Sequence, residues 1–237
     1  NLNLSSLNGT TGFKISGAAA GDHFGNSVRG AEDVNGDGFD DLIVGAYHAD
    51  PNGADSGASY AVYGFDSGSV DFAGTTGNDT LTGTAVAEVL IGGLGNDTLD
   101  GAGGADVLKG AGGNDILVFD AADRRVDGGS GVDILQFIST GQLLDLTAVA
   151  NGKVTGIETI DLTGTGNNTL TLALGDLLDS SDSTNTLRVD GNAGDVVNAG
   201  SGWTHGADQA IGAQTYATYT QGAATLLLDT DVTGIFA

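Results

Sequence analysis

A nine-residue period between Gly74 and Val118 constrains the fold of this chain more than any other feature of its sequence. Five consecutive segments follow it: GTTGNDTLT, GTAVAEVLI, GGLGNDTLD, GAGGADVLK and GAGGNDILV. Each places an acidic residue at its sixth position and a leucine two positions later. The segment FDAADRRVD then breaks the pattern, and GGSGVDILQ resumes it in register. Glycine-rich turns that alternate with short apolar segments at a fixed period predict a parallel β-solenoid.

The composition predicts a folded chain that binds a hard cation. Proline occurs once and 40% of the residues are hydrophobic, which excludes a collagen and a disordered chain. The net charge is −24, and all but three of the 31 acidic residues are aspartates. Short carboxylates in tight loops suit the coordination of Ca²⁺ by oxygen. The alternative is that they only form a soluble acidic surface.

Several classes of protein are excluded. The chain has no basic stripe for nucleic-acid phosphates, no cysteine for disulfides or thiolate metal sites, and no apolar run long enough to span a membrane. It starts at Asn1 without a signal-peptide pattern. We therefore interpret it as a fragment or a processed product of a longer protein.

Residues 1–72 are predicted to form a β-rich unit around an oxygen-rich loop, with strands at 13–15, 42–44 and 60–63. The loop DVNGDGFDD has the spacing of an EF-hand loop without its helices. Its candidate calcium ligands are four side chains at positions 1, 3, 5 and 9 and one backbone carbonyl at position 7: Asp33, Asn35, Asp37, Asp41 and, through its carbonyl, Phe39. The alternative is a simple Asn-Gly/Asp-Gly turn.

This unit resembles an FG-GAP repeat, the blade of integrin-type β-propellers. The matching residues are Phe24-Gly25, the loop 33–41, Gly45-Ala46 and the segment GASYAVYG. One repeat cannot close a propeller. The resemblance therefore implies either further blades before this one or a single unit that caps the neighbouring solenoid.

Residues 73–137 resemble the RTX family of calcium-binding proteins through the unit G-G-x-G-x-D-x-U-x. The resemblance implies a parallel β-roll in which two units form one turn and the leucines form the core. It also implies that each Ca²⁺ lies between adjacent loops of one column, held by aspartates and loop carbonyls. One column would contain four aspartates and three calcium sites: Asp79, Asp97, Asp115 and Asp133.

The opposite column would contain Glu88, Asp106 and then Arg124, so we expect it to bind calcium poorly. Val86 also stands where its first loop needs glycine. The guanidinium of Arg124 would repel calcium or pair with Asp106. An alternative is that FDAADRRVD loops out of the roll and leaves Arg124 solvated.

Residues 138–237 are predicted to be β-rich and to continue the solenoid irregularly. They resemble the C-terminal region of large RTX adhesins exported by type I secretion. The last residues, TLLLDTDVTGIFA, resemble the secretion signals of such proteins or form a final strand. Three aromatic residues are interpreted either as a sugar-binding platform or as hairpin core: Trp203, Tyr216 and Tyr219.

The sequence thus predicts an all-β protein with a calcium-binding β-roll between an FG-GAP-like unit and a C-terminal β-rich region. The chain has no HExxH or GxSxG motif, and we expect no enzymatic activity. We expect a secreted or surface-attached bacterial module, structural and adhesive, that folds on calcium after type I secretion. It would contact a cell-surface or extracellular-matrix ligand. The alternatives are a self-assembling, calcium-bridged surface-layer or filament subunit and a non-catalytic accessory region of a secreted hydrolase.

Overall fold

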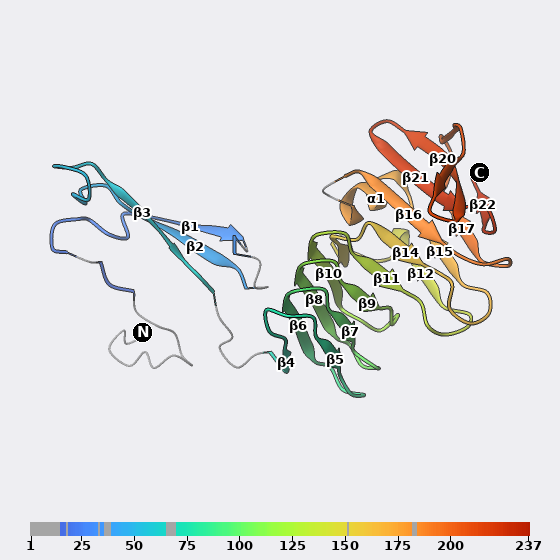
Figure 1. Ribbon diagram of the computed structural model, residues 1–237, viewed down its shortest axis with the longest axis horizontal. Helices are drawn as coiled ribbons and strands as arrows, with labels where there is room; N and C mark the ends of the chain where they lie inside the picture. Colours follow the sequence, from blue (N-terminus) through green and yellow to red (C-terminus); the bar gives the residue numbers. More distant parts are fainter. Residues whose placement is uncertain are drawn as a thin grey trace. The chain divides into compact units, whose positions relative to one another are not determined.

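The computed structural model describes residues 15–17, 19–32, 34–35, 39–64, 70–150, 152–181 and 184–237. The chain divides into two compact units, Asn1–Val70 and Asp71–Ala237 (Figure 1).

The first unit contains a three-stranded antiparallel sheet of β1 (Ser27–Glu32), β2 (Asp41–Ala46) and β3 (Ala58–Val62), with β2 in the centre. Val44 and Ala46 of β2 are buried and Ile43 is exposed, as expected for a strand end with one covered face. The strands predicted at 42–44 and 60–63 correspond to β2 and β3, although β3 ends at Val62. Of the strand predicted at 13–15, residues 13 and 14 lie outside the described residues, and Ile15 is in no strand.

The second unit starts as a two-sided parallel roll whose strands alternate between two sheets (Figure 1). One sheet contains β4 (Phe72–Ala73), β6 (Val89–Leu94), β8 (Val107–Gly112), β10 (Arg125–Ser130) and β13 (Val154–Thr155). The other begins with β5 (Thr80–Thr82), β7 (Thr98–Asp100), β9 (Ile116–Val118), β11 (Ile134–Gln136) and β14 (Thr159–Asp161). Leu81 pairs with Leu99 and Leu99 with Leu117, so one turn of the roll takes two nine-residue units.

The repeat leucines form the core of the roll, as the nine-residue period predicts. Leu90, Leu99, Leu108, Leu117 and Leu135 are fully buried. Leu81 lies in the first strand of its sheet and is only partly buried. Each leucine stacks on its equivalent one turn away, so the core is continuous along the roll.

The segment FDAADRRVD stays within the roll, so the looping-out interpretation is wrong. It ends in β10, where Val126 pairs with Leu108 of β8 and takes the place of a repeat leucine. Val126 is buried, and Phe119 stacks on Phe137 in the core with ring centroids 4.4 Å apart. Burial of these apolar groups holds the irregular segment in register with its neighbours.

The solenoid continues through residues 138–237 with longer turns and a third face. The sheet that begins with β5 and β7 extends through β16 (Thr186–Asp190) and β21 (Ala224–Asp229). A new parallel sheet contains β12 (Leu143–Asp145), β15 (Thr169–Thr171), β17 (Val196–Asn198) and β22 (Thr233–Ile235). The described residues of these turns include the 3₁₀ helix Leu146–Ala148 and α1 (Leu174–Ser180). Leu135 pairs with Ile160 and Ile160 with Val189, so the eighteen-residue turn is lost here.

An antiparallel extension ends the larger sheet and contains the aromatic residues of the C-terminal region. It consists of β18 (Thr204–His205), β19 (Gln209–Ile211) and β20 (Gln214–Gln221), which pairs with β21. Tyr216 is buried, Tyr219 stacks on Phe236, and the indole of Trp203 packs on the core. The burial of Tyr216 and the packing of the other two rings on the core favour the interpretation as hairpin core.

The neighbouring residues Leu143 and Leu144 of β12 test whether the solenoid core extends beyond the nonapeptides. Leu144 is 2% exposed and Leu143 is 56% exposed. We expect Leu144→Ala to lower the free energy of unfolding by roughly 2–5 kcal/mol because it opens a cavity. Leu143→Ala should change it by less than about 0.5 kcal/mol. Urea unfolding in saturating calcium measures both changes. Equal effects would contradict the assignment of Leu144 to the core and of Leu143 to the surface.

Candidate calcium-binding columns

Stacked aspartates line one side of the roll, in the loops that lead to β5, β7, β9 and β11. We call this set column one: Asp79, Asp97, Asp115 and Asp133. In each turn the Oδ1 atom of an aspartate accepts the backbone N–H of the acidic residue eighteen positions earlier. Asp97 accepts from Asp79 at 2.8 Å, Asp115 from Asp97 at 2.7 Å, and Asp133 from Asp115 at 2.7 Å. This ladder fixes the position of every carboxylate relative to the turn before it.

The second carboxylate oxygen of each of these aspartates lacks a partner. The Oδ2 atoms of Asp97, Asp115 and Asp133 are buried without a hydrogen-bond partner among the described residues. A buried carboxylate oxygen that accepts nothing is strongly unfavourable unless a cation or a proton binds it. The ladder therefore presents a row of anionic oxygens that fits a metal ion.

Glycine at the start of each unit makes room for these oxygens. A Cβ atom on Gly92 would lie 2.5 Å from Oδ2 of Asp97 and 2.7 Å from the carbonyl oxygen of Gly110 in the next turn. A carboxylate oxygen and a carbonyl oxygen of adjacent turns thus approach the same small space. Both are ligand types that Ca²⁺ prefers. Gly110 has the corresponding contacts with Asp115 and Gly128.

Burial raises the pKa values of the column-one aspartates above their ordinary value of 3.8. The pKa of Asp115 rises to about 6 and that of Asp133 to about 7, chiefly through loss of water. The pKa of Asp97 is also raised by burial. The neighbouring carboxylates of the column add to these shifts through charge repulsion, and backbone hydrogen bonds partly oppose them.

The first acidic residue on each side of the roll, Asp79 or Glu88, accepts its hydrogen bonds from a threonine of its own loop. Oδ2 of Asp79 accepts the N–H and hydroxyl of Thr75 at 2.6 and 2.8 Å. Glu88 likewise accepts the N–H and hydroxyl of Thr84, at 2.6 and 2.8 Å. These threonines supply donors at the first turn, where no earlier loop of the repeat precedes.

An asparagine ladder reinforces column one and was not anticipated from the sequence. The Oδ1 atom of Asn78 accepts the N–H of Asn96, and that of Asn96 accepts the N–H of Asn114, both at 2.9 Å. Asn114 accepts from Val132 in the same way. The recurring Asn-Asp pair at eighteen-residue spacing was the available signal. The opposite column has alanine at these positions, Ala87 and Ala105.

The carboxylate ladder also extends one turn beyond the nonapeptides, to Glu158. Oε2 of Glu158 accepts the N–H of Asp133 at 3.0 Å. The signal in the sequence is the same as in the repeats, because the buried Ile160 follows Glu158 by two positions. Glu158 follows Asp133 by 25 residues, whereas the aspartates of column one follow one another by 18, so the fixed period does not predict its place.

The opposite side of the roll forms column two, with Glu88 and Asp106. Oδ1 of Asp106 accepts the N–H of Glu88 at 2.8 Å, and its Oδ2 is buried without a partner in the described part of the chain. Val86 is exposed, and the loop around it still forms. The guanidinium of Arg124 is exposed and makes no described pair with Asp106, so the predicted Arg124–Asp106 pair is not formed.

A third stack, in the loops that lead to β12, β15 and β17, satisfies itself. Oδ1 of Asn168 accepts the N–H of Gln142 at 2.9 Å, and Asp195 accepts the N–H groups of Asn168 and Asn192 at 2.7 Å each. Both oxygens of Asp195 therefore have donors. This stack repeats the geometry of column one without its unpartnered oxygens.

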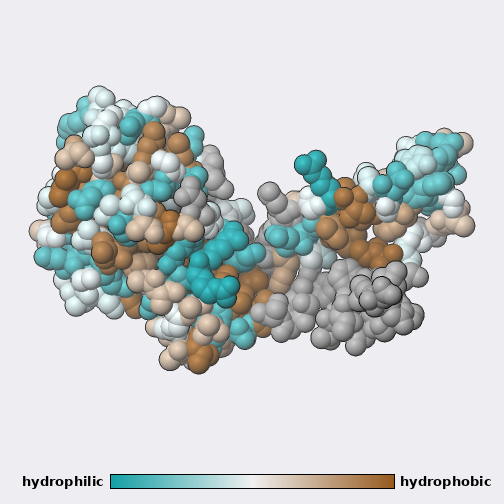
Figure 2. Space-filling view, turned by 180° about the vertical axis from the view of Figure 1, so that it is seen from behind, coloured by the Kyte–Doolittle hydropathy of each residue, from teal (hydrophilic) through white to brown (hydrophobic). Residues whose placement is uncertain are grey.

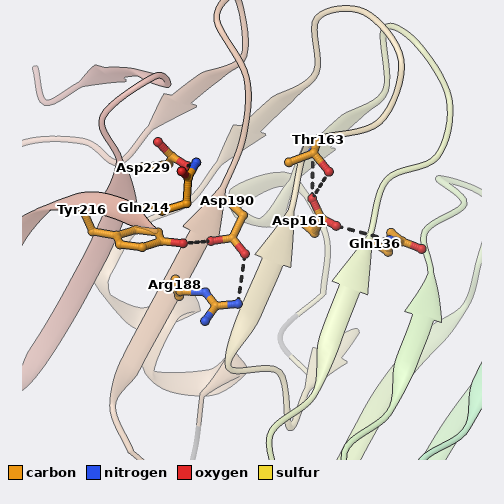
Figure 3. Close-up of polar contacts among 8 residues, drawn as sticks. All are labelled: Gln136, Asp161, Thr163, Arg188, Asp190, Gln214, Tyr216 and Asp229. Atoms are coloured by element: carbon orange, nitrogen blue, oxygen red, sulfur yellow. Dashed lines mark hydrogen bonds and ion pairs between the residues drawn. The ribbon is translucent and has the colours of Figure 1, made fainter. Parts of the chain in front are cut away.

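A polar row crosses the larger sheet near its C-terminal end (Figure 3). Asp190 accepts the hydroxyl of Tyr216 at 2.6 Å and the guanidinium of Arg188 at 3.0 Å. Asp161 accepts from Thr163 and from the side-chain amide of Gln136. Tyr216 of β20 reaches Asp190 of β16 across β21, and Gln136 and Asp161 join the adjacent strands β11 and β14. We therefore assign the row to the joining of strands in the larger sheet.

The loop of the first unit is only partly described. Asp33 and Asp37 lie outside the described residues, whereas Asn35, Phe39 and Asp41 are inside them. Asp41 is buried, and its two oxygens accept the N–H of Val34 at 2.9 Å and of Gly64 at 2.7 Å. The carboxylate thus ties the start of the loop to the segment after β3. The ligand set of this loop stays a prediction.

Comparison with known families agrees with these features. Residues 24–62 match the FG-GAP repeat, and residues 71–85 and 82–117 match the RTX calcium-binding nonapeptide repeat (4 copies). The chain carries an FG-GAP repeat followed by RTX nonapeptide repeats. No curated protein gave a match. No helix among the described residues is long and apolar enough to cross a membrane.

RTX nonapeptide repeats bind several Ca²⁺ ions, which confirms calcium as the ion expected from the sequence. The orphaned oxygens and the glycine spaces of the roll fit such ions. No group of three or more His, Asp or Glu side chains converges in the described residues. Calcium in the RTX roll would therefore depend on one or two carboxylates together with backbone carbonyls. Both repeat types are structural, non-catalytic modules, and together they indicate a calcium-binding structural module of a secreted protein.

The raised pKa values predict how pH affects the calcium-free RTX roll. Because Asp115 and Asp133 bind protons more tightly when folded, stability without calcium should be greatest near pH 4 and decrease as the pH rises to about 7. Calcium affinity should increase over the same window because the ion displaces these protons. Urea unfolding in EDTA and calcium titrations at several pH values test this. Asp133→Asn should weaken both dependences, and calcium-free stability that increases with pH would contradict the assignment.

Proposed function

We propose that this chain is a calcium-gated structural and adhesive module of a secreted or surface-attached bacterial protein, exported by type I secretion. The observation that supports it most directly is the row of buried, unpartnered carboxylate oxygens in column one. A protein that keeps such oxygens in its interior depends on a cation from outside. The repeats supply no catalytic group, and we propose that the module is not an enzyme.

The calcium ligands of column one are proposed to lie in adjacent loops. One ion would bind between Asp79 and Asp97, one between Asp97 and Asp115, and one between Asp115 and Asp133. In the first unit, a further ion would bind the loop through the candidate ligands Asp33, Asn35, Asp37, Phe39 and Asp41. The glycine spaces beside the column support the first three sites.

The gating follows from charge and entropy. Without metal, stacked carboxylates repel one another, and ordering glycine-rich loops costs roughly 1–2 kcal/mol per residue. Where free calcium is scarce, the roll would stay unfolded, which suits passage through a secretion channel. Where calcium is abundant, its binding free energy becomes folding free energy.

Self-assembly is a second candidate because of the first strands of the roll. Within the described residues, β4 pairs only with β6 and β5 only with β7. An edge strand can pair with another chain. On the face of the second unit seen in Figure 2, hydrophobic and hydrophilic residues are interspersed. A calcium-dependent filament or surface layer would therefore grow through strand edges.

Calcium titration of the chain, followed by circular dichroism and by size exclusion with light scattering, tests both candidates. We expect β-structure to form cooperatively with calcium and to disappear with EGTA. A monomer mass at saturation favours the adhesive module, and growing oligomers favour self-assembly. A chain that is folded in EGTA and binds no calcium would contradict the gating.

The substitution Asp115→Asn tests column one at its centre. The amide keeps an oxygen that can accept the N–H of Asp97, but it lacks the charge. We expect the calcium concentration at the folding midpoint to rise by ~10-fold or more, because affinity depends on ligand charge. Asp231→Asn, an exposed residue outside the columns, is the matched control and should leave the midpoint unchanged. Equal midpoints for the two variants would exclude Asp115 as a ligand.

A further inference from the structure

Column two contains an aspartate that the nine-residue period does not predict. The spacing of eighteen assigns the position after Asp106 to Arg124, yet the structure exposes Arg124 and buries Asp123. Only the backbone of Arg124 joins the stack, through an N–H that donates to the carbonyl of Asp106 at 2.8 Å. The loop is therefore one residue out of phase, and β10 restores the register at Val126.

Asp123 occupies the same relation to Asp106 that the aspartates of column one have to one another. The residue after it, Arg124, donates its N–H to the carbonyl of Asp106, just as Ile116, the residue after Asp115, donates to the carbonyl of Asp97 at 2.8 Å. Asp106 in turn accepts from the backbone of Glu88 at 2.8 Å. Asp123 also accepts the N–H of Asp120 through Oδ2 at 3.2 Å. Column two thus has three successive acidic residues, in chain order Glu88, Asp106 and Asp123.

Both buried aspartates of this column present an oxygen without a partner. Asp106 is 0% exposed and Asp123 is 2% exposed. Oδ2 of Asp106 and Oδ1 of Asp123 have no hydrogen-bond partner in the described residues. Two such oxygens in successive turns are unfavourable unless a cation lies near them.

The basic side chains around the loop are directed elsewhere. The guanidinium of Arg125 pairs with Asp127 at 2.9 Å, and the ammonium of Lys153 donates to the carbonyl of Ala121 at 3.1 Å. The other charges that act on the two aspartates are negative, and they include Asp120. The local field therefore favours a bound cation.

We propose that Asp106 and Asp123 bind one Ca²⁺ ion in column two, with Asp123 in the place that the period assigns to Arg124. This inference rests on the proposed function, in which the roll binds calcium in column one. The two carboxylates lie in successive turns, as in column one, and loop carbonyls and water would supply the remaining ligands. The irregular unit then preserves a calcium site that the sequence predicts to be lost.

Isothermal titration of the full chain with Ca²⁺ tests the site through two variants that differ by one position. Asp123→Asn should bind one ion fewer than the wild type, or bind one ion at least about tenfold more weakly. Arg124→Gln should bind the wild-type number with unchanged affinities. Loss of an ion in Arg124→Gln together with full binding in Asp123→Asn would overturn the proposal.

Further variants separate the column-two site from the proposed function, in which the roll binds calcium in column one. Asp115→Asn should lose calcium in column one, and the double variant with Asp123→Asn should lose more. If the wild type binds no calcium, the proposed function fails. If the wild type binds calcium and Asp123→Asn binds it equally, only the column-two site fails.

A variant that keeps the charge covers the case in which Asp123→Asn does not fold in saturating calcium. Asp123→Glu retains a carboxylate but lengthens it in a buried position. We expect it to fold, by circular dichroism, and to bind the wild-type number of ions with one weakened. An unchanged affinity for every ion would overturn the proposal.

Discussion

Carboxylates that are stacked inside the roll at a fixed spacing impose the main constraint on this protein. In column one, Asp97, Asp115 and Asp133 each use one oxygen to hold the preceding turn, and the other oxygen is buried without a partner. The hydrogen bonds that build the roll thus bring like charges together in its interior. In the function proposed here, calcium would resolve this conflict by binding the unpartnered oxygens and neutralising the column.

The two sides of the roll hold their stacked loops together in different ways. Column one adds a ladder of asparagines that ties each loop to the next. Column two has alanines at the equivalent positions and an irregular third loop. The burial of Val126 and Phe119 nevertheless keeps that loop within the roll, where Asp123 faces the interior. Apolar packing therefore compensates for the departure from the repeat.

The turns beyond the nonapeptides are built by the same rule with fewer charges. Asn168 replaces an aspartate, and Asp195 finds donors for both oxygens within the chain. These turns are longer, and they bury aliphatic side chains such as Leu170 and Val197 on a third face. The second unit thus combines turns that require a cation with turns that satisfy their own polar groups. Calcium dependence should be concentrated in the nonapeptide part.

The sequence alone determined the regular part of the fold. A strict period fixes which residues share a face, so the leucine core, the eighteen-residue turn and the aspartates of column one could all be predicted from spacing. The large excess of aspartate over glutamate among the acidic residues indicated calcium. The FG-GAP loop could also be recognised, because its ligand spacing is local.

Only the tertiary structure decided what happens where the period fails. Whether FDAADRRVD leaves the roll depends on the burial of its apolar residues, and a one-residue shift exchanges Arg124 for Asp123 in the column. The place of Glu158 in the ladder depends on a turn whose length no local pattern fixes. The roles of Trp203 and Tyr216 depend on a sheet that joins distant segments. Spacing determines contacts only while the repeat is regular; beyond it, packing between turns selects which side chain is buried.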